Sequence, residues 1–255
     1  MIFDELFLIQ LQSQLNRIEL DKSLAIHINF YEKETKDFVD NLPFKLTNAQ
    51  RQSAWEIIKD IGKNKPMARL LEGEVGSGKT LVACIAMLNV ALFGKQAVLM
   101  VPTEILALQH YDSLRRLFTE FNLKIGLITR NQKQISNFQL PTSNKNKIKN
   151  QDIIDNSDII IGTHALIQEK IKFKNLALAI IDEQHRFGVE QRAALLAQNG
   201  TSQRKLMPHL LSMTATPIPR SLAMALYGDL DLSIINELPK NRKKIITQVV
   251  PESKR

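Results

Sequence analysis

The sequence has one cysteine, Cys84, among its 255 residues, so no intrachain disulfide can form. This excludes the disulfide-stabilised folds of small secreted proteins. Because Cys84 lies in an apolar stretch, we expect it to be a small buried residue. His27, His110 and His209 follow no metal-ligand spacing, and we therefore expect no zinc site.

Long hydrophobic runs are also missing. The longest, residues 81–93, reads LVACIAMLNVALF, contains Asn89 and is shorter than the ~20 residues that a membrane-spanning helix needs. The first ten residues are MIFDELFLIQ, with Asp4 and Glu5 where a secretory signal would carry positive charge. We therefore expect a soluble, cytoplasmic protein with no membrane partner.

The composition that is present is that of a globular protein. Hydrophobic residues make up 44% and charged residues 24%, which is enough apolar material for one large core. Lysine and arginine outnumber the acids by 34 to 26, which gives a net charge of +8. This excess suits a polyanionic partner such as nucleic acid, but many basic proteins bind none, so charge leaves both alternatives open.

The first 61 residues show two helical patterns. Apolar residues recur at spacings of three or four near the start, and we expect that helical face to pack on the body of the protein: Phe3, Phe7, Leu11, Leu15 and Ile18. The polar stretch 29–41 is typical of a linker. Thr47 is a candidate N-cap, with Gln50 at the third position of a helix through Trp55 to residue 61. We expect Trp55 to lie in the core.

Apolar runs then alternate with helical patterns. The runs lie at residues 67–71, 97–101, 124–129, 158–162, 176–181 and 209–213, with helices expected at 79–93, through His110 to residue 118, and after Pro219. Strands that alternate with helices indicate parallel pairing, and unbroken apolar strands indicate a sheet covered on both faces. The sequence thus predicts an α/β fold in three layers, with a mainly parallel central sheet after an N-terminal helix. Residues 130–150 are polar and predict an exposed, mobile insertion.

A phosphate-binding motif follows the first predicted strand. Residues 73–80 read GEVGSGKT and match G-x-x-x-x-G-K-[ST] between a strand and a helix. In this motif the glycines, here Gly73, Gly76 and Gly78, let backbone N–H groups surround the phosphates. Lys79 would reach the β- and γ-phosphates, and the Thr80 hydroxyl would bind Mg²⁺. The sequence therefore predicts a nucleotide site, to which Ser77 also belongs.

Two adjacent acids end the fifth predicted strand. Asp182 and Glu183 follow the apolar run 176–181 directly. Because the carboxyl ends of parallel strands meet at one edge of a sheet, these acids can face the phosphate motif. We expect Asp182 to hold Mg²⁺ and Glu183 to orient and deprotonate the attacking water. Without the phosphate motif, an exposed acidic turn would be the simpler reading.

Three motifs together resemble the signature of superfamily 2 helicases: GEVGSGKT at 73–80, DEQH at 182–185 and TATP at 214–217. The longer stretches PTEILALQHY at 102–111, IGTHALIQ at 161–168 and DEQHRFGVEQR at 182–192 are similar to RecG-type branched-DNA helicases. The transcription–repair coupling translocases share TATPIPR but tend to read DEEQ. The resemblance covers most of residues 43–247 and implies a RecA-like P-loop domain that hydrolyses ATP with Mg²⁺.

The resemblance also assigns roles to residues that spacing alone does not. Gln50, in LTNAQ, matches the glutamine that reads the adenine edge, and Phe44 lies in the same nucleotide-binding stretch. Catalytic roles fall on Glu183, Lys79 and Asp182 and on the motif residues Gln184, His185, Thr214 and Thr216. DNA-contacting segments are matched by Pro102, Thr103, Gly162, Thr163 and His164. Such segments grip phosphates, so DNA contact would be largely independent of sequence.

The expected organisation has three parts: an N-terminal helix and linker at 1–42, an ATP-binding domain at 43–240, and the start of a connection to a second motor domain at 241–255. In such helicases the second domain supplies arginines that stabilise charge on the γ-phosphate. None of those arginine motifs is found here, so a separately encoded second domain is one expected partner. Two functions stay open: the first motor half of a bacterial, nucleoid-associated RecG-type helicase acting in recombination and repair, or an ATP–Mg²⁺ binding module that cannot unwind DNA alone.

Overall fold

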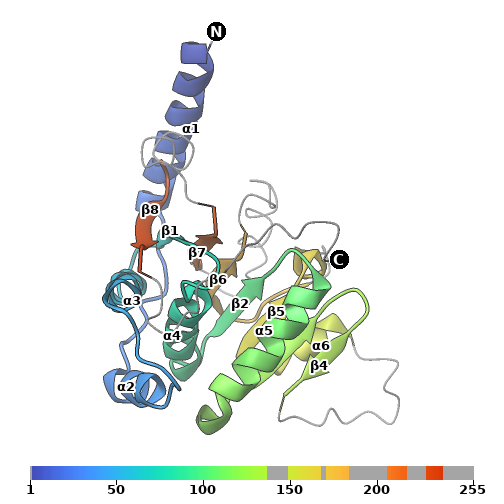
Figure 1. Ribbon diagram of the computed structural model, residues 1–255. Coiled ribbons are helices and arrows are strands. Elements are labelled where there is room, and N and C mark those ends of the chain that lie inside the picture. The colour runs from blue at the N-terminus through green and yellow to red at the C-terminus, as the bar shows by residue number, and fades with distance from the viewer. Residues whose placement is uncertain (1, 137–148, 168–170, 184–205, 217–227, 238–255) are drawn as a thin grey trace, which may run out of the picture.

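A mainly parallel sheet forms the centre of the protein (Figure 1). The structure is a computed structural model, and it describes residues 2–136, 149–167, 171–183, 206–216 and 228–237. Within these residues the sheet has eight strands in the order β4-β3-β5-β2-β6-β7-β1-β8. All neighbours pair in parallel except β3 and β4. The strands are β1 (Ala68–Gly73), β2 (Gln96–Met100), β3 (Ile125–Ile128), β4 (Lys133–Ile135), β5 (Ile159–Gly162), β6 (Leu176–Ile181), β7 (His209–Thr214) and β8 (Asp231–Ile235).

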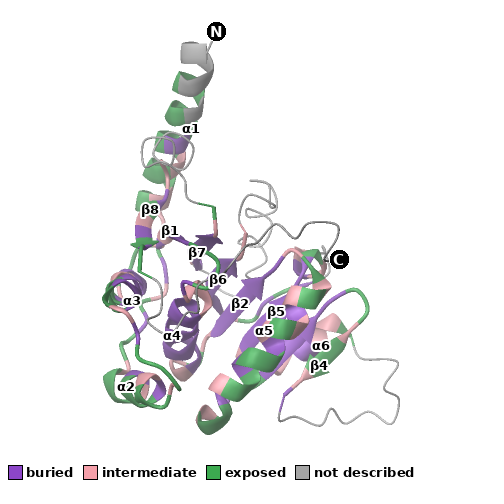
Figure 2. Ribbon diagram, viewed as in Figure 1, coloured by how far each residue is buried: buried purple, intermediate pink, exposed green. Residues whose placement is uncertain are grey.

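Helices cover both faces of this sheet, which confirms the three-layer α/β prediction. The larger apolar cluster joins one face to residues of α2 (Glu32–Asp40), α3 (Asn48–Ile61), α4 (Lys79–Leu92) and α5 (Glu104–Leu117). The smaller cluster joins the other face to α6 (Asn150–Asp155). The inner strands β2, β5, β6 and β7 are buried along their whole length, as unbroken apolar runs predict (Figure 2).

The six predicted strands and the helices α3, α4 and α5 are confirmed. The expected cap of α3 is also present: Gln50 N–H donates to Thr47 Oγ1, and Thr47 N–H donates to Gln50 Oε1. Cys84 is fully buried, as expected, and burial raises the pKa of its thiol to about 12. The helix predicted after Pro219 and the connection at 241–255 lie outside the described residues.

Three expectations for residues 29–150 differ from the structure. The stretch 29–41 contains α2, and its Phe38 is buried in the core. A short helix that buries only one face has few apolar residues, so its composition resembles that of a linker. The predicted insertion at 130–150 begins with β4, a short antiparallel edge strand, while residues 137–148 lie outside the described residues. Trp55 is 53% exposed and packs edge-on against Phe30. The spacing from Trp55 to Ile58 and Ile61 therefore does not place it on the buried face of α3.

The N-terminal helix α1 (Ile2–Lys22) is present but does not pack on the body as expected. It projects from the sheet in Figure 1, and five large apolar side chains along it are 44–61% exposed: Phe7, Leu8, Leu11, Leu15 and Ile18. Its C-terminal end is attached through Arg17, which pairs with Asp231 of β8 at 3.0 Å. Among the described residues, no helix has the length and apolar character needed to cross a membrane.

Buried polar contacts hold β1, the strand that leads into the phosphate motif, against α3 and β8. Arg69 of β1 binds Asp60 of α3 and donates to Ser233 Oγ of β8 at 2.8 Å. Burial acts to raise the pKa of Asp60, but hydrogen bonds from Lys63 and Arg69 outweigh it and hold that pKa below its usual value. These contacts tie α3 and β8 to β1, the strand that leads into the phosphate motif.

His209 joins the segment after α1 to the sheet. Its fully buried ring accepts a hydrogen bond from Met67 N–H at Nδ1 (3.0 Å), so Nε2 carries the proton and donates to the Ile26 carbonyl (2.8 Å). Burial lowers the pKa of His209 below its ordinary 6.5. The folded state therefore requires the neutral ring.

This requirement predicts a loss of stability in mild acid. Below about pH 6.5 the unfolded chain binds a proton on His209 that the folded chain rejects, so the free energy of unfolding falls as pH falls. We expect the melting temperature of the wild type to drop between about pH 7.5 and pH 5.5. In His209→Gln, which has no titrating ring, the drop should be smaller, as calorimetry at both pH values will show. Parallel drops in the two proteins would contradict the assignment.

Candidate functional site

The phosphate loop connects β1 to α4 and is shaped by its glycines. Gly76 and Gly78 have φ of +81° and +89°, a region that disfavours side chains. A Cβ on Gly73 would lie 2.5 Å from Ser77 Oγ, and a Cβ on Gly78 would lie 2.3 Å from Gln50 Nε2. The positive φ at Gly76 and Gly78 and the close approach of Ser77 at Gly73 therefore favour glycine at these positions, and Gly78 is also the N-cap of α4.

Lys79 lies over this loop. Its Nζ donates to the carbonyls of Gly73 (2.6 Å) and Glu74 (3.1 Å). Burial lowers the pKa of the ammonium group, while the negative charges of Asp182 and Glu183 act to raise it. The acids at the end of β6 and the lysine of the phosphate loop therefore share one site, although about a hundred residues separate them in the sequence.

The sheet explains why they meet. β6 and β1 both pair with β7 in parallel, so Asp182, Thr214 and the phosphate loop follow the carboxyl ends of three adjacent strands. The Asp182 carboxylate accepts the N–H of Glu183 at Oδ1 (3.0 Å), and Glu183 has a left-handed φ of +54°. On β7, Thr214 is buried and its hydroxyl lies 2.8 Å from that of Thr216.

Of the two residues expected to contact adenine, Gln50 lies beside the loop. Gln50 is 1% exposed, and its Nε2 donates to the Ser77 carbonyl at 2.7 Å, so its amide joins the cap of α3 to the phosphate loop. Phe44 is 46% exposed. Ser77 Oγ and Thr80 also lie in the site; Ser77 Oγ is buried with no hydrogen-bond partner among the described residues.

The expected DNA-contacting segments lie further along the same edge. Pro102 and Thr103 lie between β2 and α5. Thr103 is the N-cap of α5, and its hydroxyl oxygen accepts a hydrogen bond from Leu106 N–H at 3.3 Å. Gly162 ends β5, the strand beside β2, and its carbonyl accepts the N–H of Val101 at 2.9 Å. Thr163 and His164 follow it. The structure therefore brings the two segments side by side, whereas Gln184 and His185 lie outside the described residues.

His110 is a site residue that the sequence did not reveal. It lies on α5, and its Nε2 is 3.6 Å from Asp182 Oδ2, with the two side chains 13% and 15% exposed. The contact joins a helix after β2 to the end of β6, so no local spacing predicts it.

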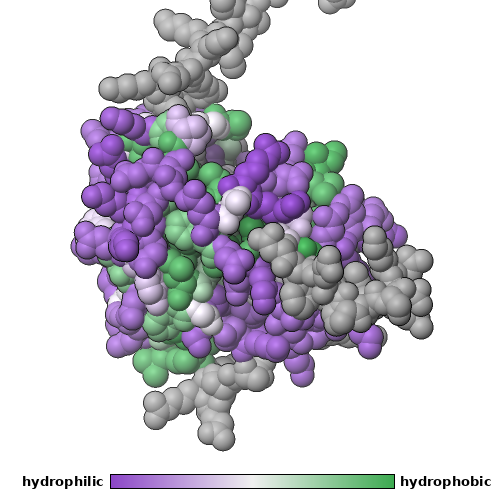
Figure 3. All heavy atoms as spheres, turned by 90° about the horizontal axis from the view of Figure 1, so that it is seen from below, coloured by the Kyte–Doolittle hydropathy of each residue, from purple (hydrophilic) through white to green (hydrophobic). Residues whose placement is uncertain are grey.

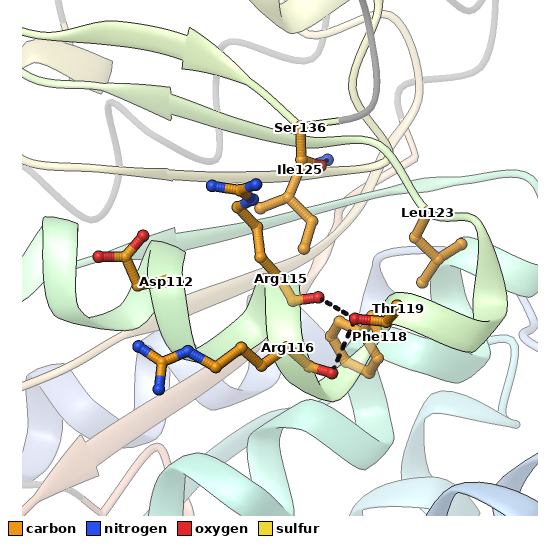
Figure 4. Close-up of a pocket in the computed structure, with 8 residues that line it drawn as sticks. All are labelled: Asp112, Arg115, Arg116, Phe118, Thr119, Leu123, Ile125 and Ser136. Atoms are coloured by element: carbon orange, nitrogen blue, oxygen red, sulfur yellow. Dashed lines mark hydrogen bonds between the residues drawn. The ribbon is translucent and has the colours of Figure 1, made fainter.

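A hollow of about 320 Å³ lies at the other end of α5 from Thr103 (Figure 4). Its lining consists of Asp112, Arg115, Arg116, Phe118, Thr119, Leu123, Ile125 and Ser136. These residues come from the C-terminal half of α5, the segment between α5 and β3, the start of β3 and the residue after β4, opposite to the edge that carries the phosphate loop. The hollow is therefore separate from the candidate site. The surface seen in Figure 3 is mostly hydrophilic, with smaller hydrophobic areas between the polar side chains.

Comparison with known proteins gives three kinds of match. The model of the DEAD/DEAH box helicase family matches residues 47–225. The chain is 46% identical to the ATP-dependent DNA helicase RecG of Aquifex aeolicus over 254 residues, which cover 100% of this chain and 31% of that protein. It is 47% identical to RecG of Thermotoga maritima, with 98% and 30% covered. The chain thus spans about a third of the length of these relatives.

Solved structures agree with this match. A structure of RecG bound to a three-way DNA junction superposes with a TM-score of 0.79 at 43% identity, covering 98% of this chain and 32% of that one. A hypothetical ATP-dependent RNA helicase from Sulfolobus tokodaii is similar with a TM-score of 0.52 at 19% identity, with 80% of this chain and 56% of that one covered. The second similarity concerns the RecA-like fold alone.

Proposed function

Because the chain belongs to the DEAD/DEAH box helicase family, we propose that it is the ATP-hydrolysing first motor domain of a RecG-type DNA helicase that acts on branched DNA in recombination and repair. The observation that carries this proposal is that Lys79 and the acids Asp182 and Glu183 meet at the carboxyl edge of the sheet, where β1 and β6 both pair with β7. A P-loop kinase or GTPase would share the loop but would not account for the Thr214–Thr216 hydroxyl pair.

In this proposal each residue has a mechanistic role. Backbone N–H groups of the loop and the N-terminus of α4 bind the phosphates, and Lys79 exchanges its two carbonyl partners for phosphate oxygens. Glu183 takes the proton of the attacking water. Thr214 and Thr216 transmit the state of the γ-phosphate towards the DNA-contacting segments. Gln50 links the base-binding stretch to the loop through its bond to the Ser77 carbonyl.

The donor set around the loop fits Mg²⁺. The ion prefers oxygen ligands, keeps several waters, and is bound by one or two carboxylates together with substrate phosphates. Asp182 offers a carboxylate and Thr80 a hydroxyl, and a cation also offsets the repulsion between Asp182 and Glu183. When bound, the ion would neutralise charge on the β- and γ-phosphates.

DNA is the proposed partner at the adjoining edge, through Pro102, Thr103, Gly162, Thr163 and His164. The solved RecG relative is bound to a three-way junction, and the net charge of +8 favours contact with phosphates.

The proposed organisation keeps an ATP-binding domain over residues 43–240. The segment 25–41 joins its core, because Ile28 and Phe38 belong to the larger apolar cluster. A second motor domain, within a longer protein or encoded separately, would complete the site.

A module that binds ATP–Mg²⁺ without unwinding DNA is the second candidate, because the match covers about a third of the RecG relatives. Both candidates predict saturable binding of ATP by the 255-residue chain, which Mg²⁺ strengthens, and preference over GTP. They differ in whether the chain hydrolyses ATP and whether it binds DNA.

The test measures fluorescent-ATP binding, phosphate release and retention of a three-way junction by the same preparation. For the motor domain we expect slow hydrolysis, junction binding that weakens steeply with salt, and little stimulation of hydrolysis by DNA, because a second domain supplies the arginines. Binding of ATP with neither turnover nor DNA retention would favour the module. Absence of Mg²⁺-dependent ATP binding would exclude both.

A further inference from the structure

The carboxylate of Asp182 is held on two sides. Its Oδ1 accepts the backbone N–H of Glu183 (3.0 Å), and its Oδ2 faces Nε2 of His110 at 3.6 Å. The backbone beneath it is fixed as well, because Asp182 N–H donates to the Met100 carbonyl at 2.9 Å. Oδ1 is therefore held by a hydrogen bond, whereas Oδ2 only faces the imidazole at ion-pair distance.

His110 is fixed by the helix that carries it. Ala107, Tyr111 and Leu114 form the buried face of α5, each no more than 2% exposed, so the helix is packed firmly on the sheet. His110 follows the N-cap Thr103 by seven residues, about two helical turns. A shift of the Thr103 end of α5 would therefore move the imidazole relative to Asp182.

We propose that His110 is a positioning residue, which orients Asp182 for a divalent cation and joins that carboxylate through α5 to the DNA-contacting segment at Pro102 and Thr103. The inference rests on the proposed function, because it assumes that Asp182 binds the metal of a bound nucleotide. A separation of 3.6 Å is just longer than a hydrogen bond, and such contacts commonly shorten when the ligand arrives.

The chemistry favours an orienting role over direct coordination. The imidazole reaches Oδ2 from the helix side, while Mg²⁺ prefers oxygen ligands and binds imidazole poorly. Neighbouring groups that orient a metal-binding side chain typically change metal affinity 10- to 100-fold when they are removed. Removal of His110 should therefore lower the affinity for the metal ion and leave the phosphate contacts of the loop unchanged.

The test uses Mn²⁺ as the probe, measured by electron paramagnetic resonance in the 255-residue chain with a non-hydrolysable ATP analogue. In His110→Ala we expect Mn²⁺ affinity to fall about tenfold, with metal-free affinity for the analogue within about twofold of wild type. His110→Gln keeps an N–H donor and should recover most of the loss. Gln109→Ala, on the exposed side of the same turn, should behave as wild type.

The outcomes separate the two levels of inference. Unchanged Mn²⁺ affinity in His110→Ala overturns the positioning role while the proposed nucleotide site stands. An equal loss of analogue affinity with and without metal assigns His110 a structural role and also overturns it. If the wild type binds no analogue, the proposed function fails and this inference fails with it.

A second measurement tests the connection through α5. Coupling between DNA and metal is reciprocal, and typical couplings change affinity by about 5- to 150-fold. We expect a saturating single-stranded oligonucleotide to change Mn²⁺ affinity at least about fivefold in the wild type and not in His110→Ala. Equal factors in the two proteins, including no effect in either, would overturn transmission through the helix.

Discussion

In Lys79→Ala we expect the affinity for ATP with Mg²⁺ to fall about 100-fold or more, because losing one partner of a desolvated charge pair costs about 2–5 kcal/mol. The ammonium group lies over the loop and bonds to the Gly73 and Glu74 carbonyls. Phosphate oxygens would replace those neutral acceptors with charged ones, which bind more strongly. Titration with a fluorescent ATP analogue measures the loss.

The variant should nevertheless fold. Burial lowers the pKa of Lys79, so burying the charged ammonium group costs free energy in the free protein, and of its two acceptors the Glu74 carbonyl belongs to an exposed residue. We therefore expect a melting temperature close to that of the wild type. Lys36→Ala is the matched control, since it removes the same charge from an exposed position on α2. ATP affinity in Lys79→Ala within about threefold of wild type would remove Lys79 from the site.

Strand positions were predictable because their apolar runs are unbroken. Residues of β2, β5 and β6 are buried on both faces, and such strands leave a continuous signal in the sequence. The edge strands β4 and β8 were missed. β4 has three residues, and both strands are partly exposed and pair with one neighbouring strand each; β8 is also held by the contact of Arg69 with Ser233. Neither feature leaves a periodic pattern.

The parts of the site were predictable to different degrees for a related reason. The phosphate loop is formed by eight consecutive residues, 73–80, so its motif can be recognised from their spacing alone. The two acids are recognisable because they directly follow an apolar strand. The contact between His110 and Asp182 depends on how α5 crosses the sheet, which no single segment encodes. The exposure of Trp55 and of the apolar side chains of α1 depends on the position of those helices relative to the body. Helical spacing identifies an apolar face but does not say what covers it.

Replacement of the proposed general base gives the second large effect. In Glu183→Gln we expect the rate of ATP hydrolysis to fall at least about 100-fold, the usual contribution of a general base, while ATP affinity stays within about threefold. Glutamine has the same shape, and it meets the left-handed φ of +54° at the same backbone cost as glutamate. The Glu183 N–H bond to Asp182 Oδ1 is also retained, because it comes from the backbone.

The assay must separate the chemical step from binding. Single-turnover phosphate release, with the chain in excess over ATP, reports hydrolysis directly even when turnover is slow. Glu32→Gln is the matched control, an exposed acid in the first turn of α2. Glu183→Gln also removes one of the two negative charges that act to raise the pKa of Lys79, so the affinities of wild type and variant are compared at the same pH. A hydrolysis rate within about tenfold of wild type would assign the base to another residue. Unchanged hydrolysis together with the expected loss in Lys79→Ala would leave a nucleotide site whose catalytic acid–base chemistry comes from elsewhere.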